Sequence, residues 1–351
     1  MAATAHDRNA TRRATSRCRT APRALAALAV VATALAGCGV ASGPVTGART
    51  QRPVPPAVAS GSTQRAATQR AATLPAVVAT AARPCLGTAA PRRYAHVIWI
   101  VMENKSYASA LGASAPATRA LAARCGIASG YHGVTHPSLP NYLAMTSGST
   151  HGVRNDANPS AHRIAGSSIF SQVAAARLRW ATYAESMPTL CRRTSSGRYA
   201  VRHNPAAYYT ALARTCARSD VAMGTTTRGP LLTAIRTGRL PAFTLMVPNL
   251  CSDTHDCSVA TGDRWLARWL AVILSSRTYA AGRTAVFITW DEDDNSHANR
   301  VALLMVAPSV RPHTVVRGTY NHLNLLRTTE DMLGLPALVR RAASLRRPAH
   351  L

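Results

Sequence analysis

The sequence predicts an α/β domain with a doubly wound, mostly parallel sheet and helices on both faces. Three short apolar runs, 94–102, 242–247 and 284–289, have the pattern of strands that are buried on both faces. Each run continues into a polar segment, and in parallel α/β sheets functional groups gather at the carboxyl ends of strands. Further strands are expected at 179–184 and 301–307. Helices are expected at 115–123, 138–147, 231–237, 265–273 and from about 322 to Gly334.

The first 37 residues have the pattern of an export signal peptide. A basic segment with Arg12 and Arg23 precedes the apolar stretch 24–36, which is too short for a membrane span. The stretch ends in Leu35-Ala36-Gly37-Cys38, which resembles the lipobox of bacterial lipoproteins, where the cysteine becomes the lipidated first residue. We therefore expect a lipoprotein anchored through Cys38 at the outer face of the cell membrane. An ordinary cleaved signal, and thus a secreted protein, is the alternative.

The rest of the chain divides into a linker and one domain. Residues 38–83 are rich in small and polar residues without apolar periodicity, so we interpret them as a disordered tether before a catalytic domain at 84–351. The net charge of +27 would attract anionic lipid, nucleic acid or phosphorylated substrates, although codon bias with a basic leader explains it as well. We expect no nucleic-acid partner, because the sequence has neither a zinc-finger spacing nor a basic run with interleaved aromatic residues.

The cysteines indicate disulfides. Of the eight cysteines, Cys18 leaves with the signal peptide and Cys38 would carry the lipid. Three disulfides are expected from the remaining six in an exported protein, and six cysteines allow 15 connectivities. One of these joins sequence neighbours, as Cys85–Cys125, Cys191–Cys216 and Cys251–Cys257. A cysteine-rich metal site is the alternative, but the sequence has no C-x-x-C pair.

Ser138 is a candidate nucleophile. It lies where the polar turn that begins at Thr135 meets an apolar helical run ending before Gly148. A hydroxyl at a helix N-terminus lies among free N–H groups and the positive end of the helix dipole, which suits a phosphate. The alternative is that Ser138 only caps the helix.

Acidic and histidine-bearing segments follow the expected strands. Glu103 and Asn104 end the first strand, and Asp291 and Glu292 end the strand at 284–289. Carboxylates this close together need a cation, and hard oxygen ligands suit one. A second polar loop follows the strand at 242–247 and contains Asp253, His255 and Asp256. His322 at the start of the last helix could donate to a phosphate or bind metal.

Together these segments resemble the bacterial phosphoesterase family of acid phosphatases and phospholipases C, within the alkaline phosphatase superfamily. The residues that carry the resemblance are Glu103-Asn104-Lys105-Ser106-Tyr107, His136-Pro137-Ser138-Leu139-Pro140-Asn141-Tyr142, Pro248-Asn249-Leu250-Cys251 with His255-Asp256, Thr289-Trp290-Asp291-Glu292, and Tyr320-Asn321-His322 with Leu325-Leu326-Arg327. They follow the family's order from about residue 94 to 336. Ser138-Leu139-Pro140-Asn141 also looks like the nucleophile turn of nucleotide pyrophosphatases, which favours Ser138 over Thr135.

The resemblance implies an alkaline phosphatase-like fold and an exported, metal-dependent hydrolase of phosphoric esters that works through a phosphoseryl intermediate on Ser138. It implies one divalent cation (Mg, Ca, Mn or Zn) held by Glu103, Asn104, Asp291 and Glu292. His255 and His322 would stabilise phosphoryl oxygens or protonate the leaving group. The substrate, a small phosphorylated molecule or a phospholipid head group, would meet the remaining candidates, which are His136, Asn141, His203, Asn204, Asp253 and Asp256.

Two departures from the superfamily pattern narrow the expected number of metal ions and the expected substrate class. The Asp-x-x-x-His pair of a second metal site is absent, and Glu292 stands where two-zinc enzymes have histidine, so one cation is expected. Phospholipases C of the family often have Asp-Glu-His-Gly-Gly, and Asp293 replaces that histidine, which favours a phosphatase over a phospholipase C-type phosphodiesterase. The rival class is a non-catalytic, basic surface lipoprotein that binds anionic polymers. A monomer is expected.

Overall fold

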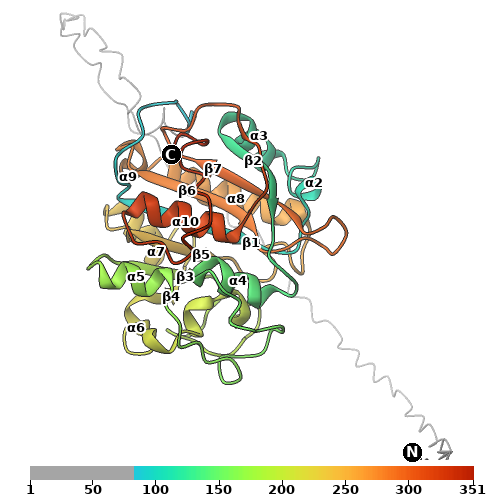
Figure 1. Cartoon of the computed structure of the whole chain (residues 1–351), viewed down its shortest axis with the longest axis vertical. Coiled ribbons are helices and arrows are strands. Elements are labelled where there is room, and N and C mark those ends of the chain that lie inside the picture. The colour runs from blue at the N-terminus through green and yellow to red at the C-terminus, as the bar shows by residue number, and fades with distance from the viewer. Residues whose placement is uncertain (1–82) are drawn as a thin grey trace, which may run out of the picture. The chain divides into compact units, whose positions relative to one another are not determined.

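The computed structural model describes residues 83–351 (Figure 1). The expected signal peptide at 1–37 and the expected tether up to residue 82 lie outside the described residues. None of the helices in the described part has the length and hydrophobicity needed to cross a membrane.

The core of the domain is one nine-stranded sheet with the order β4-β3-β5-β1-β6-β7-β2-β8, in which β9 also pairs with β2. The strands are β1 (His96–Met102), β2 (Gly126–His132), β3 (Trp180–Ala184), β4 (Asp220–Ala222), β5 (Phe243–Val247), β6 (Thr284–Trp290), β7 (Arg300–Val306), β8 (Thr314–Val316) and β9 (Tyr320–Asn321). Only β7 runs antiparallel to its neighbours among these strands, so the predicted mostly parallel sheet is confirmed.

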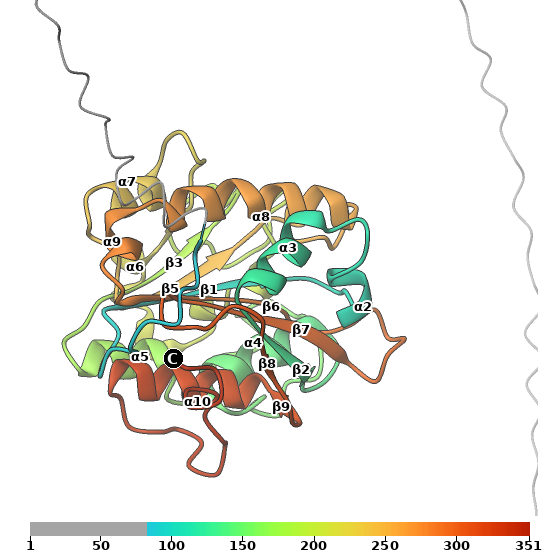
Figure 2. The same cartoon turned by 90° about the horizontal axis from the view of Figure 1, so that it is seen from above.

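Helices cover both faces of the sheet (Figure 2). One face carries α3 (Pro116–Arg124), α7 (Pro230–Arg236), α8 (Val259–Leu274) and α9 (Arg277–Ala280). The other face carries α4 (Ser138–Ser147), α5 (Ile169–Ala175) and α10 (His322–Leu333). Two short helices, α2 (Tyr107–Ala110) and α6 (Cys216–Ser219), and three 3₁₀ turns at Val201–His203, Pro205–Ala207 and Thr210–Leu212 complete the domain.

The elements expected from periodicity are present, because their apolar residues form the core. Val97 to Met102 of β1 are fully buried, and α8 buries Trp265, Trp269 and Ile273. The start of α8 was expected near 265 but lies at Val259, where the Ser258 hydroxyl accepts from Thr261 N–H and caps the helix. Strand β2 was not expected, because its sequence GIASGYH has no apolar run, and it forms between β7 and β8.

Three disulfides join sequence neighbours, as Cys85–Cys125, Cys191–Cys216 and Cys251–Cys257. The three expected disulfides are thereby confirmed, and of the 15 possible connectivities the structure has the one between sequence neighbours. Disulfides persist in oxidising compartments and are rare in the cytosol, so they indicate an extracytoplasmic location for the folded domain.

Candidate active site

The turn before α4 presents the hydroxyl of Ser138. The cap position of α4 is Pro137, so Ser138 is the first helical residue and its hydroxyl does not cap the helix. Instead, Ser138 Oγ lies 3.1 Å from Oε2 of Glu103 and 3.4 Å from Oε1 of Glu292, to which it can donate. The capping interpretation of Ser138 is therefore wrong, and the hydroxyl faces two carboxylates at the positive end of a helix.

Asn141 holds this turn in place from one helical turn further on. Its Oδ1 accepts from the N–H groups of Val134 and Thr135 at 2.8 and 3.0 Å. Its Nδ2 donates to the Thr135 carbonyl at 2.7 Å and to Oε2 of Glu292 at 3.0 Å. Asn141 is fully buried, and it connects the nucleophile turn to the acidic segment after β6.

Sheet register brings the metal-ligand candidates together. Met102 of β1 lies opposite Trp290 of β6, so the residues that follow, Glu103 and Asp291, leave neighbouring strands at the same level. The N–H of Asn104 donates to Oδ1 of Asp291 at 3.3 Å. Glu103, Asp291 and Glu292 thus converge on the start of α4, and Asn104 joins them through its backbone contact with Asp291.

Burial makes this acidic cluster costly without a counter-charge. Glu103 and Asp291 are fully buried, and burial, followed by the charge of Asp291, raises the pKa of Glu103 well above its usual value. Burial raises the pKa of Asp291 to about 7, and burial with the Asp291 charge raises that of Glu292 to about 9. Asn104 Oδ1 and Asp291 Oδ2 are buried oxygens without a hydrogen-bond partner. Oxygen donors in this arrangement fit a divalent cation.

His203 extends the cluster toward the loop after β5. Its Nε2 lies 3.4 Å from Oε1 of Glu103, and its Nδ1 lies 3.3 Å from Oδ2 of Asp253. Burial lowers the pKa of His203 well below its usual value and raises that of Asp253 to about 7. Ligand atoms of these three residues lie within 4.8 Å of one another, so they form a second group that could hold a metal. Tyr142 stacks on His203 and donates its hydroxyl hydrogen to Glu103.

His255 lies at the outer side of this group with a partner on each ring nitrogen. Its Nδ1 lies 2.7 Å from Oδ1 of Asp256, and Nη2 of Arg202 lies 3.2 Å from its Nε2. Arg202 also lies 3.7 Å from Asp156, whose Oδ1 accepts from the N–H of Leu139, directly after Ser138, at 2.9 Å. Sequence reasoning missed Arg202, Asp156 and Tyr142. The only available signal for Arg202 was its position next to His203.

His136 borders the cluster on its more exposed side. Its Nδ1 lies 3.0 Å from Oε2 of Glu292, and its side chain is 32% exposed. Its Nε2 lies 3.5 Å from Asp293, which otherwise accepts from the N–H groups of Asn295, His297 and Asn299. Asp293 therefore organises the acidic loop, while Asp291 and Glu292 face Ser138.

Two candidates lie apart from the carboxylates that Ser138 faces. His322 is fully buried behind Asp291, its Nε2 2.6 Å from the Asp291 carbonyl and its Nδ1 2.9 Å from the Tyr131 hydroxyl. Burial lowers the pKa of His322 to about 4, so the ring is neutral and both nitrogens are engaged. Asn204 donates to Oδ1 of Asp220 at 2.8 Å and to the Tyr199 hydroxyl at 3.0 Å, in a separate buried cluster.

Comparisons with known proteins identify the family of the chain. The sequence profile of the Phosphoesterase family matches residues 113–336. A phosphatidylinositol-3-phosphatase from Mycobacterium tuberculosis is 33% identical over 260 residues, covering 72% of this chain and 81% of that protein. An acid phosphatase from Aspergillus fumigatus is 25% identical over 60% of this chain and 48% of its own length, so the chain spans about half of that relative.

Solved structures share the fold at low sequence identity. An alkaline phosphatase superfamily protein from Vibrio parahaemolyticus has a TM-score of 0.51 at 9% identity, with 77% of this chain and 76% of that chain covered. A putative sulfatase from Bacteroides thetaiotaomicron has a TM-score of 0.52 at 12% identity, covering 74% and 75%. The expected alkaline phosphatase-like fold is confirmed.

Proposed function

Because the chain belongs to the Phosphoesterase family and is a phosphatase-type hydrolase of phosphoric ester bonds, we propose that it is an exported, metal-dependent phosphatase that attacks phosphorus through Ser138. One observation carries this proposal: the Ser138 hydroxyl, at the start of a helix, lies 3.1 Å from Glu103 and 3.4 Å from Glu292. The hydroxyl is the nucleophile of in-line displacement, and a phosphoseryl intermediate is then hydrolysed by water.

The residues around Ser138 supply orientation and a proton path. The hydroxyl of Ser138 can donate its one hydrogen to Glu103 or to Glu292, and an ionised carboxylate among the two can take that proton as the Ser138–phosphorus bond forms. Asn141 fixes both the turn and Glu292, which keeps the nucleophile and its acceptor at a constant separation. The helix N-terminus favours the negative charge that reaches it.

A divalent cation is the cofactor that these residues fit. Glu103, Asn104, Asp291 and Glu292 would hold it, as the orphaned oxygens of Asn104 and Asp291 suggest. When bound, such an ion lowers the pKa of a nearby hydroxyl and neutralises charge on the phosphoryl group. Oxygen ligands suit Mg, Ca or Mn, and the nearby histidines would admit Zn.

The residues around the acidic cluster either contact the substrate or position another residue of the site. Arg202 offers its guanidinium to phosphoryl oxygens. His255 has Arg202 on one ring nitrogen and Asp256 on the other, so we assign it the positioning of that guanidinium rather than the protonation of the leaving oxygen. His322 has both nitrogens engaged, so we assign it the positioning of Asp291 rather than a contact with phosphate. His136 positions Glu292 at 3.0 Å, and Asp253 positions His203 at 3.3 Å.

The substrate class that these features favour is a phosphoric monoester. Both relatives described above carry phosphatase names, and Asp293 is occupied in holding its own loop. The test measures hydrolysis of p-nitrophenyl phosphate and of bis-p-nitrophenyl phosphate, each with and without a chelator. Chelator-sensitive hydrolysis of the monoester is expected. Preferential hydrolysis of the diester would instead support the phospholipase C-type alternative, and chelator-resistant activity would contradict the metal assignment.

We also propose that the protein is exported and attached to the membrane. Three disulfides suit an oxidising compartment, and Cys38 would hold the monomeric enzyme to the outer face of the cell membrane through its lipid.

A further inference from the structure

The amino ends of the central strands carry exposed arginines. Strands β5, β1 and β6 are neighbours and run parallel, so their first residues lie along one edge of the sheet. Each of the three is preceded by two exposed arginines. These six residues, called the arginine edge, are Arg92 and Arg93 before β1, Arg236 and Arg239 before β5, and Arg277 and Arg283 before β6.

The same strands end in carboxylates, so charge is separated along the sheet. Glu103 follows β1, Asp253 follows β5 and Asp291 follows β6. Strands of five to seven residues hold these groups about 20 Å from the arginine edge, which is about two Debye lengths at physiological salt. At this distance the negative charges of the active site therefore neutralise little of the positive potential around the arginine edge.

The arginines of the arginine edge form no ion pairs within the described part of the chain. None of its six members forms an ion pair with a described carboxylate. Near the amino ends of the strands, Asp220 is buried, and Asp331 at the end of α10 pairs with Arg327 at 2.9 Å. The positive charge of this edge is available to an external anionic partner.

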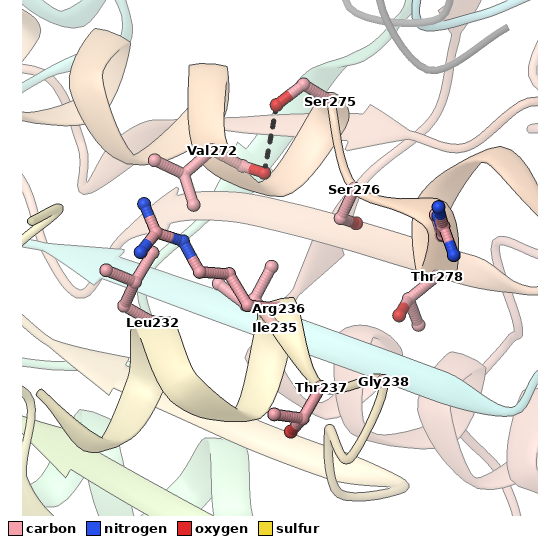
Figure 3. A pocket seen from close by; sticks show the side chains of 10 residues that line it. Leu232, Ile235, Arg236, Thr237, Gly238, Val272, Ser275, Ser276 and Thr278 are labelled. Carbon is pink, nitrogen blue, oxygen red and sulfur yellow. Dashed lines mark hydrogen bonds between the residues drawn. The ribbon is translucent and has the colours of Figure 1, made fainter. Parts of the chain in front are cut away.

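The surface of the edge is hollowed between its helices. A pocket of about 450 Å³ lies between the end of α7 and the junction of α8 and α9 (Figure 3). Arg236 and Arg277 line it together with the hydroxyl-bearing Ser276 and Thr278. The hydroxyl of Ser276 donates to the Ile273 carbonyl and caps α9, so the two guanidinium groups are the donors that match the phosphate of a lipid head group.

The chain enters the domain at this edge. The carbonyl of Pro84 accepts from the hydroxyl of Tyr279 in α9 at 2.7 Å, beside Arg277 and Arg283. Cys85 is bonded to Cys125, which directly precedes β2. If the chain is anchored through Cys38, as proposed above, the segment that follows the anchor would therefore join the domain at the arginine edge.

We propose that the arginine edge docks the domain onto an anionic phospholipid bilayer, with the active site on the side that faces away from it. Basic residues near an anionic leaflet each add to attraction, and their effect is lost with rising salt. In this orientation the enzyme acts on phosphoric esters that arrive from outside, and lipids of its own membrane do not reach Ser138.

Vesicle binding tests this directly. The purified chain with Cys38→Ala, which cannot be lipidated, is mixed with vesicles of phosphatidylcholine alone or with added phosphatidylglycerol, and sedimentation measures binding. Binding is expected only with phosphatidylglycerol. The variant Arg92→Gln, Arg236→Gln, Arg239→Gln, Arg277→Gln should bind roughly tenfold or more weakly while hydrolysing p-nitrophenyl phosphate at an unchanged rate.

A matched variant separates the edge from net charge. Arg154→Gln, Arg163→Gln, Arg198→Gln, Arg264→Gln changes four exposed arginines outside the edge and should keep most of the binding. Equal loss in both variants, or equal binding to neutral vesicles, would overturn the proposal. So would edge-dependent binding to heparin without binding to phosphatidylglycerol vesicles, which would indicate a soluble polyanion. The phosphatase assay tests the proposed function separately from membrane docking. A chain that binds vesicles through the arginine edge but lacks phosphatase activity would contradict only the proposed function.

Discussion

The hydroxyl of Ser138 lies 3.4 Å from Oε1 of Glu292, a residue 154 positions later in the chain. Glu103, 35 positions before Ser138, lies at 3.1 Å from the same hydroxyl. No local interaction forces these contacts. They arise because β1 and β6 are parallel neighbours whose carboxyl ends meet beside the start of α4.

Ser138→Ala should lower kcat on p-nitrophenyl phosphate by at least about 10³-fold, because it removes the proposed nucleophile. The melting temperature should change little, since the hydroxyl does not cap α4. Thr135→Ala is the matched control, because Thr135 lies in the same turn and its hydroxyl donates only to the His136 carbonyl among described residues. Near-normal turnover in Ser138→Ala, or comparable loss in both variants, would contradict the assignment.

Asp291→Asn should lose both the bound metal and about 10²-fold or more of activity, because it removes one carboxylate from the ligand set. Addition of metal should raise the melting temperature of the wild type and not that of the variant. Metal content and thermal unfolding measure this together. Asp294→Asn changes an exposed acid of the same run that bonds to Ser296, and it should keep metal and activity. A variant Asp291→Asn that retains stoichiometric metal would refute the site.

Asp220→Asn should change the pH dependence of stability. Burial raises the pKa of Asp220 to about 7 in the folded state, above its usual 3.8. The folded state therefore binds the Asp220 proton more tightly than the unfolded state does. The contribution of this proton to the free energy of unfolding is full below about pH 4 and is lost as pH rises to about 7. The variant should be more stable than the wild type at pH 8, by about 2–4 kcal/mol, and not at pH 4.

Urea unfolding at both pH values measures this difference. Asp331→Asn, at a surface pair with Arg327, should change the free energy of unfolding by less than about 1 kcal/mol at either pH. A difference between Asp220→Asn and wild type that is the same at pH 4 and pH 8 would show that Asp220 does not titrate differently in the folded state.

Cys38→Ala should release the protein from the membrane fraction or block its processing, because the proposed lipid would attach to that cysteine. Cell fractionation with mass spectrometry of the mature N-terminus measures both. Cys18→Ala, within the expected signal peptide, is the control and should leave fractionation unchanged. A wild-type N-terminus other than a modified Cys38 would contradict the lipoprotein assignment.

The sequence by itself determined the elements that bury continuous apolar runs and the polar residues that follow them. The strand patterns of β1, β5 and β6 and the helical face of α8 predicted core elements, since burial on one or both faces leaves a periodic signal. The positions of Glu103, Ser138 and Asp291 at element ends predicted that they share one site. Small or polar segments such as β2 left no such signal, because their pairing depends on neighbouring strands.

Only the tertiary structure decided which side chains face which. His322 and Asn204 looked equivalent to other candidates in sequence, yet one is held between Tyr131 and Asp291 and the other by Asp220. Arg202 and Asp156 became site residues through contacts with His255 and Leu139 that no spacing in the sequence encodes. The arginine edge likewise exists only because parallel strands bring their first residues to one side. Periodicity records burial along a segment, whereas contacts between segments follow from sheet order and register.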